Sequence, residues 1–225
     1  MKPLDAPRLP FDDRQQAGRV LAEMLEDYRG RENLLVLALP RGGVAVGFEV
    51  AHALQAPLDV FVVRKLGFPG DEEYAMGAIA SGGVRVMNRS PGMRVSPEVL
   101  AAVVAREQAE LARRELLYRD GKPAAAIRGR SVIVVDDGVA TGSTMRAAVA
   151  AIRQQLPAHV AVAVPVGAEE TCRQLRGEAD AVVCAATPRP FRAVGLWYRD
   201  FPQATDDEVR ELLEEARREH ALSVH

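Results

Sequence analysis

One segment near the middle of the chain constrains the fold more than any other. It covers residues 132–144 and reads VIVVDDGVATGST. Its four β-branched apolar residues are typical of a strand that is buried on both faces, as in parallel sheets. Two carboxylates, a short loop of small and hydroxylic residues, and an Ala-rich helical stretch over 145–156 follow. The segment predicts an α/β fold with a polar loop at the carboxyl end of a strand.

The loop has the composition of an anion site. Main-chain amides at a helix N-terminus favour a phosphate, and Gly142 lets the backbone approach it closely. Asp136 and Asp137 could accept hydrogen bonds from sugar hydroxyls and hold Mg2+ through water. The alternative is an ordinary strand-to-helix turn, which needs one capping Asp and no hydroxyl cluster. The predicted phosphate-binding residues are Ala140, Thr141, Gly142, Ser143 and Thr144.

Residues 132–144 resemble the phosphoribosyl pyrophosphate (PRPP) signature of type I phosphoribosyltransferases. The likeness lies in an apolar strand, two acidic residues, small or apolar residues, and then Thr-Gly and a hydroxyl. The resemblance implies that the 5-phosphate of PRPP binds residues 140–144 and that the ribose hydroxyls face Asp136 and Asp137. It also implies that family's fold: a mostly parallel sheet flanked by helices, with a flexible hairpin loop and a small hood.

A second glycine loop follows the predicted strand 34–39 in the sequence LALPRGGV. It matches neither the dinucleotide nor the Walker pattern, so alone it fits a structural turn as well as an anion site. Beside the first motif it resembles the pyrophosphate loop of the family, with Arg41 as the cation and the amides of Gly42 and Gly43 as donors. That family often has a non-proline cis peptide here, and the matching bond is Pro40–Arg41.

Two basic residues, Arg64 and Lys65, close the predicted strand 58–63. They resemble a basic pair in orotate phosphoribosyltransferases and would then be a second clamp on pyrophosphate, with Lys65 beside Arg41. The alternative is a pair of surface charges. Residues 67–74 correspond to the mobile catalytic loop of the family, and their edge glycines and lack of an apolar stripe favour a poorly anchored stretch in a lid over 66–83. A plain surface hairpin, with 75–80 paired to 84–87, is the alternative.

The chain alternates strands with helices and is read as one domain over 1–225. Its core is expected at about 31–190, its hood at 1–30 and 191–225, and an inserted helix at 97–119, with Ser96 as N-cap. Thr205 and Glu208 form a capping box that starts a final helix. The further predicted elements are an amphipathic helix within 12–28 and strands at 160–166 and 181–184.

The acceptor side is less specific. Trp197 and Tyr198 are proposed as an aromatic wall for a base, because their rings combine apolar bodies with polar tips; Phe191 and Phe201 are assigned to packing. Packing of the terminal helices would explain the same rings. Hypoxanthine-guanine enzymes carry an Asp where this chain has Ala140, so they are poor guides to its acceptor.

Composition excludes several classes of function. The formal net charge of −2 argues against a nucleic-acid face, and no apolar run approaches the ~20 residues that span a membrane. Four scattered histidines lack zinc-ligand spacing. The start lacks a signal core, so a cytoplasmic protein with two reduced cysteines, Cys172 and Cys184, is expected. Small molecules are the expected partners, and a homodimer stays open.

The resemblance implies a Mg2+-dependent enzyme that transfers ribose 5-phosphate from PRPP to a nitrogen nucleophile. The segment 194–201 and the helix start at 205–209 are similar to a group of bacterial predicted phosphoribosyltransferases of unassigned substrate. Two alternatives stay open: a regulator that binds PRPP without transfer, and a phosphohydrolase, which would need more acidic ligands.

Overall fold

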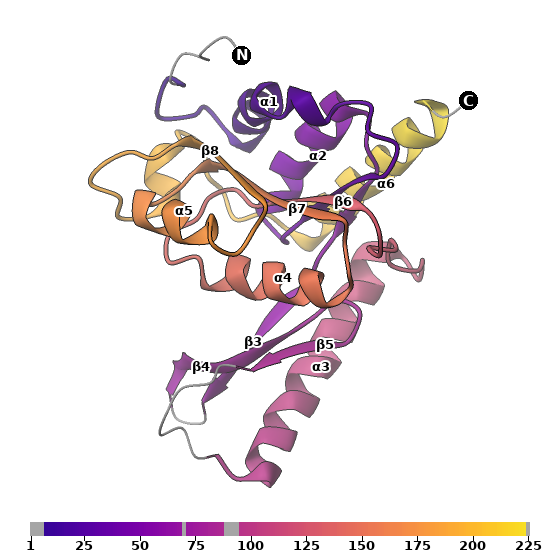
Figure 1. Ribbon diagram of the computed structural model, residues 1–225, viewed down its shortest axis with the longest axis vertical. Coiled ribbons are helices and arrows are strands. Elements are labelled where there is room, and N and C mark those ends of the chain that lie inside the picture. The colour runs from indigo at the N-terminus through magenta and orange to yellow at the C-terminus, as the bar shows by residue number, and fades with distance from the viewer. Residues whose placement is uncertain (1–6, 69–70, 88–94, 224–225) are drawn as a thin grey trace.

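The computed structural model of the chain describes residues 7–68, 71–87 and 95–223. A five-stranded sheet with the order β2-β1-β6-β7-β8 lies at its centre, and every strand pairing in it is parallel (Figure 1). This confirms the expected mostly parallel sheet. The strands are β1 (Leu34–Ala38), β2 (Leu58–Val60), β6 (Ser131–Val135), β7 (His159–Val166) and β8 (Ala181–Ala186).

Helices cover both faces of this sheet. On one face lie α1 (Arg14–Met24), α2 (Gly43–Leu54) and α6 (Asp206–Ser223), and on the other α4 (Ser143–Gln154) and α5 (Glu169–Leu175). All five residues of strand β1 are buried. Val36 packs into the core on the side of α2 and α6, and Leu37 packs into the core on the side of α4 and α5. A strand covered on both faces needs apolar side chains at every position.

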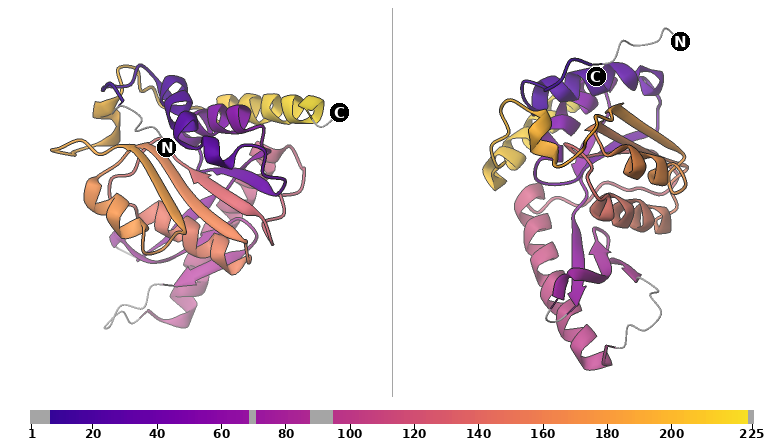
Figure 2. Two further views of the ribbon diagram at one scale, coloured as in Figure 1. Left: turned by 45° about the horizontal axis from the view of Figure 1, so that its top comes forward. Right: turned by 90° about the vertical axis from the view of Figure 1, so that its left-hand side faces the viewer.

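A second sheet projects from the body together with a long helix (Figure 2). Strands β3 (Val63–Phe68), β4 (Asp71–Ala80) and β5 (Val84–Met87) are antiparallel, and α3 (Pro97–Arg119) runs beside them. The pairing of β4 with β5 confirms the predicted hairpin. The predicted strand 58–63 is wrong, because the chain leaves the parallel sheet after Val60 and enters the second sheet at Val63.

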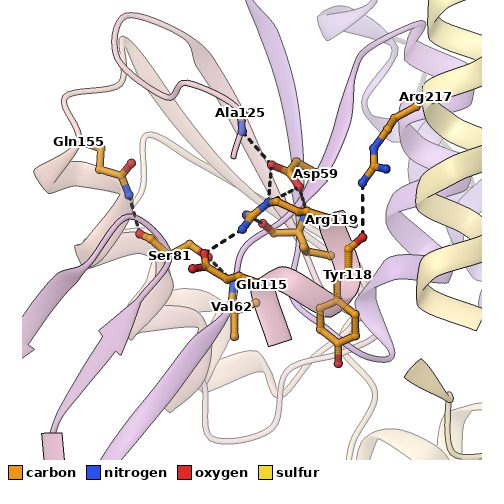
Figure 3. Close-up of polar contacts among 10 residues, drawn as sticks. Asp59, Val62, Ser81, Glu115, Tyr118, Arg119, Ala125, Gln155 and Arg217 are labelled. Atoms are coloured by element: carbon orange, nitrogen blue, oxygen red, sulfur yellow. Dashed lines mark hydrogen bonds and ion pairs between the residues drawn. The ribbon is translucent and has the colours of Figure 1, made fainter. Parts of the chain in front are cut away.

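A buried ion pair fastens the end of α3 to the central sheet (Figure 3). Arg119 donates through Nε to both carboxylate oxygens of Asp59, at 3.0 and 3.2 Å, and through Nη2 to the carbonyl of Val60 at 2.7 Å. The amide of Ala125 donates to the same Asp59 carboxylate, and Glu115 accepts from Arg119. Because both charges are largely withdrawn from water and fully hydrogen-bonded, the contact sets the position of α3.

Both predicted helix caps form. The Ser96 hydroxyl accepts from the amide of Val99 at 3.3 Å, and Thr205 and Glu208 exchange side-chain bonds to each other's amides at 2.7 and 3.1 Å. The expectation of reduced cysteines is wrong for this structure, which joins Cys172 of α5 to Cys184 of β8 in a disulfide. The two residues have no motif spacing, so only the packing of α5 on the sheet reveals their proximity. Within the described ranges, no helix has the length and apolar character to cross a bilayer.

Candidate active site

The two glycine loops meet at one edge of the central sheet. Strands β1 and β6 are parallel neighbours with Ala38 opposite Val135, and the amide of Leu39 donates to the carbonyl of Val135 at 2.9 Å. The loops that follow the two strands must therefore lie side by side. A Cβ atom on Gly42 would lie 1.9 Å from Oδ2 of Asp137, so only glycine fits there. The peptide bond between Pro40 and Arg41 is cis, as expected from the resemblance.

The predicted phosphate loop ends at the N-terminus of α4. Gly142 is its N-cap residue with φ of 75°, a left-handed conformation that favours glycine. The hydroxyl of Thr171 donates to the carbonyl of Ala140 at 2.6 Å, and Arg146 donates to the carbonyl of Thr141 at 3.0 Å. Thr141 is exposed. The loop is thus held from behind by α5 and α4 and presents the start of a helix to solvent, the arrangement that binds phosphates.

The acidic pair lies at the carboxyl end of β6. Burial raises the pKa of Asp136 well above its usual value, and the neighbouring Asp137 charge adds to the rise. Burial also raises the pKa of Asp137, although Arg14 opposes this. The amide of Asp137 donates to Oδ1 of Asp136 at 2.9 Å. Carboxyls kept partly desolvated in an open loop cost stability and are typical of functional sites.

Arg14 is a site residue that the sequence analysis missed. It is the first residue of α1, its side chain is only 11% exposed, and its Nε donates to Oδ2 of Asp137 at 2.8 Å. Its Nη1 donates to the carbonyl of Pro202 at 2.8 Å, and its guanidinium carbon lies 3.8 Å from the centre of the Phe201 ring. No local sequence pattern relates Arg14 to Asp137, because the two are far apart in the chain. The sequence showed only that Arg14 lies near the start of an amphipathic helix.

Arg41 lies beside this cluster. Together with Arg14, Gly42 and residues 201–204 it lines a cavity of about 310 Å³. Its guanidinium is 3.9 Å from Oδ1 of Asp206, the first residue of α6, and Tyr118 donates to the same oxygen at 2.7 Å. The predicted pyrophosphate loop therefore has its own cation, Arg41, which reaches toward α6, and a second cation beside it, Arg14 of α1.

The basic pair of β3 is divided between two environments. Arg64 donates to Glu107 of α3, a carboxylate that is itself buried, with a closest contact of 2.6 Å. In this structure the charge of Arg64 is paired within the second sheet, and its role as a clamp on pyrophosphate stays a prediction. Lys65 is exposed and, with Thr141, Ser143 and Arg146, lines a cavity of about 480 Å³. Lys65 thus shares a cavity with residues of the predicted phosphate loop, whereas Arg41 lines a different cavity, and the shared role of Lys65 and Arg41 at pyrophosphate stays a prediction.

The edges of residues 66–83 are anchored, because Leu66, Met76 and Ile79 are buried in the main core. These three residues flank residues 67–74, the stretch expected to be poorly anchored, and the mobility of that stretch stays a prediction. Residues 69 and 70, at the centre of the proposed lid, lie outside the described residues.

The aromatic rings of the hood pack together. The hood cluster consists of buried Phe11, Ala17, Val166 and Tyr198, with Leu9, Val20, Phe191, Val194, Trp197 and Phe201 packed against it. Tyr198 is 6% exposed and stacks on Phe201 at 4.8 Å, so its predicted role as an acceptor wall is wrong. Trp197 is half-buried and lies 6.4 Å from the Phe191 ring. Its contact with an acceptor stays a prediction, whereas the packing assignment of Phe191 and Phe201 agrees with the structure.

Metal binding would rest on the acidic pair. Among the described residues no group of three or more His, Cys, Asp or Glu side chains could hold an ion. Mg2+ is commonly bound by one or two carboxylates, with water and substrate phosphates as its other ligands. Asp136 and Asp137, adjacent to each other and to a phosphate loop, fit that kind of site and not a closed protein cage.

Comparisons with known proteins agree on one family. A profile of the phosphoribosyl transferase domain matches residues 12–189. Proteins from two strains of Mycobacterium tuberculosis that carry the provisional name phosphoribosyl transferase are 47% identical over 213 residues, 94% of this chain. The chain spans about half of their length, 48%. A crystallised protein from Thermus thermophilus is 44% identical with a TM-score of 0.81, covering 91% of this chain and 98% of its own.

Proposed function

This chain belongs to the phosphoribosyl transferase domain family, and from that premise we propose that it transfers ribose 5-phosphate from PRPP to a nitrogen nucleophile and releases pyrophosphate. The observation that carries the proposal is the contact between the two glycine loops, which places Gly42 against Asp137. One loop would hold the 5-phosphate and the other the pyrophosphate, with the acidic pair between them.

The chemistry asks the protein mainly for positioning and charge. The transition state resembles a ribooxocarbenium ion, so no protein nucleophile is needed. Residues 140–144 would bind the 5-phosphate through amides and hydroxyls, with Lys65 facing the same loop. Asp136 and Asp137 would orient the ribose hydroxyls, and Arg41 with the amides of Gly42 and Gly43 would stabilise the charge that develops on the leaving pyrophosphate.

Mg2+ is the proposed cofactor. Asp136 and Asp137 would hold it through water, and the bound ion would neutralise charge on the pyrophosphate oxygens. Burial and the neighbouring Asp137 raise the pKa of Asp136, and a bound cation would offset the cost of keeping both carboxylates charged. The hood and the second sheet flank the loops from two sides, where they could limit access of water, which competes as an acceptor.

The acceptor is proposed only by class. Ala140 carries no carboxylate that could serve a purine nitrogen, so hypoxanthine and guanine should be poor acceptors. Trp197 is the hood ring left for a base to contact, since Tyr198 is buried. Base stacking on an aromatic ring is worth roughly 1–3 kcal/mol, so Trp197→Ala should weaken acceptor binding and leave PRPP affinity unchanged.

The test is PRPP turnover with Mg2+ against a panel of bases, amines and water, followed by pyrophosphate release. We expect turnover with at least one nitrogen acceptor, and its loss in the double variant Asp136→Asn/Asp137→Asn. The exposed pair Glu26 and Asp27 offers a matched control, because Glu26→Gln/Asp27→Asn changes two adjacent charges outside the site. PRPP binding without any turnover would instead support a binding protein, and wild-type turnover in the Asn variant would overturn the assignment of the acidic pair.

A further inference from the structure

Arg14 has bonding capacity that its protein contacts do not use. Its Nε binds Asp137 and its Nη1 binds the carbonyl of Pro202, both at 2.8 Å, while its Nη2 makes no hydrogen bond to any residue in the described ranges. The Phe201 ring lies against the guanidinium at 3.8 Å and limits its rotation. A guanidinium held at two edges presents its remaining donors in a fixed direction.

Arg14 also lines the cavity beside Arg41 and Gly42. Arg14, Arg41 and Gly42 share the cavity of about 310 Å³, and residues 201–204 form its other wall. A Cβ atom on Gly42 would lie 3.2 Å from Nε of Arg14, so the loop and the guanidinium are in direct contact. Asp137 at 2.8 Å from Arg14 and Asp206 at 3.9 Å from Arg41 each offset part of this positive charge, and an anion in the cavity would meet both guanidinium groups.

We propose that Arg14 is a pyrophosphate-binding residue, contributed by the hood, and that it also positions Asp137. This inference rests on the proposed function for the identity of the ligand, but its chemistry is that of any diphosphate. Arginine forks match phosphate oxygens, and a second arginine opposite Arg41 would hold both phosphates of a diphosphate. The 2.8 Å contact from Nε of Arg14 to Oδ2 of Asp137 fixes where this carboxylate lies beside the loop.

The arrangement links ligand binding to the stability of the hood. The side chain of Arg14 contacts the acidic pair, the 201–204 segment and the pyrophosphate loop together. A diphosphate bound by Arg14 and Arg41 would therefore add to contacts that α1 and the 201–204 segment already make with the loop. The binding of pyrophosphate is thus expected to stabilise the hood.

The test compares three ligands at fixed Mg2+ concentration by calorimetry: PRPP, pyrophosphate and ribose 5-phosphate. For Arg14→Gln we expect binding of PRPP and of pyrophosphate to weaken roughly 10- to 100-fold, the loss typical of charge-assisted hydrogen bonds. Ribose 5-phosphate lacks the diphosphate and loses only the positioning of Asp137, so its binding should weaken clearly less than that of PRPP and pyrophosphate. Arg14→Lys keeps the positive charge but not the two-pronged guanidinium. Its affinity for PRPP and pyrophosphate should lie between those of wild type and Arg14→Gln. Arg19→Gln, on the same helix and paired with Glu49 at the surface, is the matched control.

Each outcome decides something. Equal weakening of all three ligands would show that Arg14 only supports Asp137 and would overturn the pyrophosphate role, as would unchanged binding of all three. If Arg14→Gln does not fold, Arg14→Lys with pyrophosphate alone gives the answer. A wild-type protein that binds pyrophosphate but not PRPP would sink the proposed function, and the Arg14 inference would then be decided by pyrophosphate affinity alone.

Discussion

The phenolic hydroxyl of Tyr198 donates a hydrogen bond to the main-chain carbonyl oxygen of Asp137 at 2.5 Å. Burial raises the pKa of this phenol far above its ordinary value, and the charge of Asp137 acts in the same direction. The hood therefore fixes the backbone of the acidic pair through Tyr198 while it holds the side chain through Arg14. Two contacts from remote parts of the chain determine the position of one carboxylate.

Tyr198→Phe should weaken both stability and ligand binding. A lost hydrogen bond at a buried carbonyl costs about 1–3 kcal/mol of the free energy of unfolding, because the acceptor is left without a partner. PRPP affinity should fall as well, since the backbone of Asp137 is then free to shift. Denaturant unfolding and calorimetric titration measure the two effects. Tyr28→Phe removes a comparable bond, from Tyr28 to His159 at 3.1 Å, and should lower stability without changing PRPP affinity.

Asp136→Asn should stabilise the protein at neutral pH and lose that effect in acid. The pKa of Asp136 is raised in the folded state, so the folded state binds its proton more strongly and wild type loses stability as pH rises through that pKa. Asparagine has no charge to desolvate. We expect the Tm of the variant to exceed that of wild type near pH 8 and to match it near pH 4. Each kcal/mol gained in the free energy of unfolding should raise Tm by about 2–4 °C. A Tm difference that is independent of pH would contradict the buried-charge account.

Much of the central sheet was predictable because its strands carry a signal at every position. The runs 34–38 and 131–135 are apolar almost throughout, and the order of strand, polar loop and helix then places both glycine loops at one edge. The second sheet was harder to foresee. Residues 58–68 form two strands with only a short break between them, so the sequence reads as one strand. Only the hydrogen bonds between Val62 and Ser81 show where the chain leaves the parallel sheet.

Sequence reasoning found the parts of the candidate site whose residues are neighbours in the chain. It missed the contacts between residues that are far apart in the chain. The phosphate loop and the pyrophosphate loop are local motifs. The partner of Arg64 is Glu107, and the partner of Asp137 is Arg14. Whether a basic residue is free to bind a ligand depends on such distant partners. The sequence near the strand therefore could not show that Arg64 has an acidic partner and that Lys65 is exposed.

Gly42→Ala should displace the acidic pair. The added methyl group would lie 1.9 Å from Oδ2 of Asp137, far inside contact distance, so either the loop or the carboxylate must move. We expect PRPP affinity to fall at least 10-fold, a loss of about 1.4 kcal/mol, with a smaller loss of stability. Gly177→Ala is the control, because its nearest neighbour would be 3.4 Å away, and its PRPP affinity should equal that of wild type. Equal affinities in both variants would contradict the proposed proximity of the loops.

Reduction of the disulfide between Cys172 and Cys184 should lower the melting temperature. The bond closes a loop with a sequence separation of 12 residues. Closing a loop of this length is worth about 3 kcal/mol in the chain-entropy description, or roughly 6–12 °C for a chain of this size. Thermal melts with and without dithiothreitol measure the effect. The double variant Cys172→Ser/Cys184→Ser should not respond to the reductant, and an equal response in both proteins would show that the bond does not form in solution.

Asp59→Ala should be among the most destabilising single changes in the protein. It removes the carboxylate that Arg119, 4% exposed, contacts with two hydrogen bonds, and it leaves the amide of Ala125 without its acceptor. Removing one partner of a buried ion pair costs about 3–5 kcal/mol, because the remaining charge stays desolvated. Urea unfolding measures this loss, and hydrogen exchange should show the C-terminal turns of α3 opening first. Arg113→Ala on the same helix breaks an exposed pair with Glu110 and should change stability by less than about 1 kcal/mol. Similar losses in the two variants would mean that Asp59 does not anchor the helix.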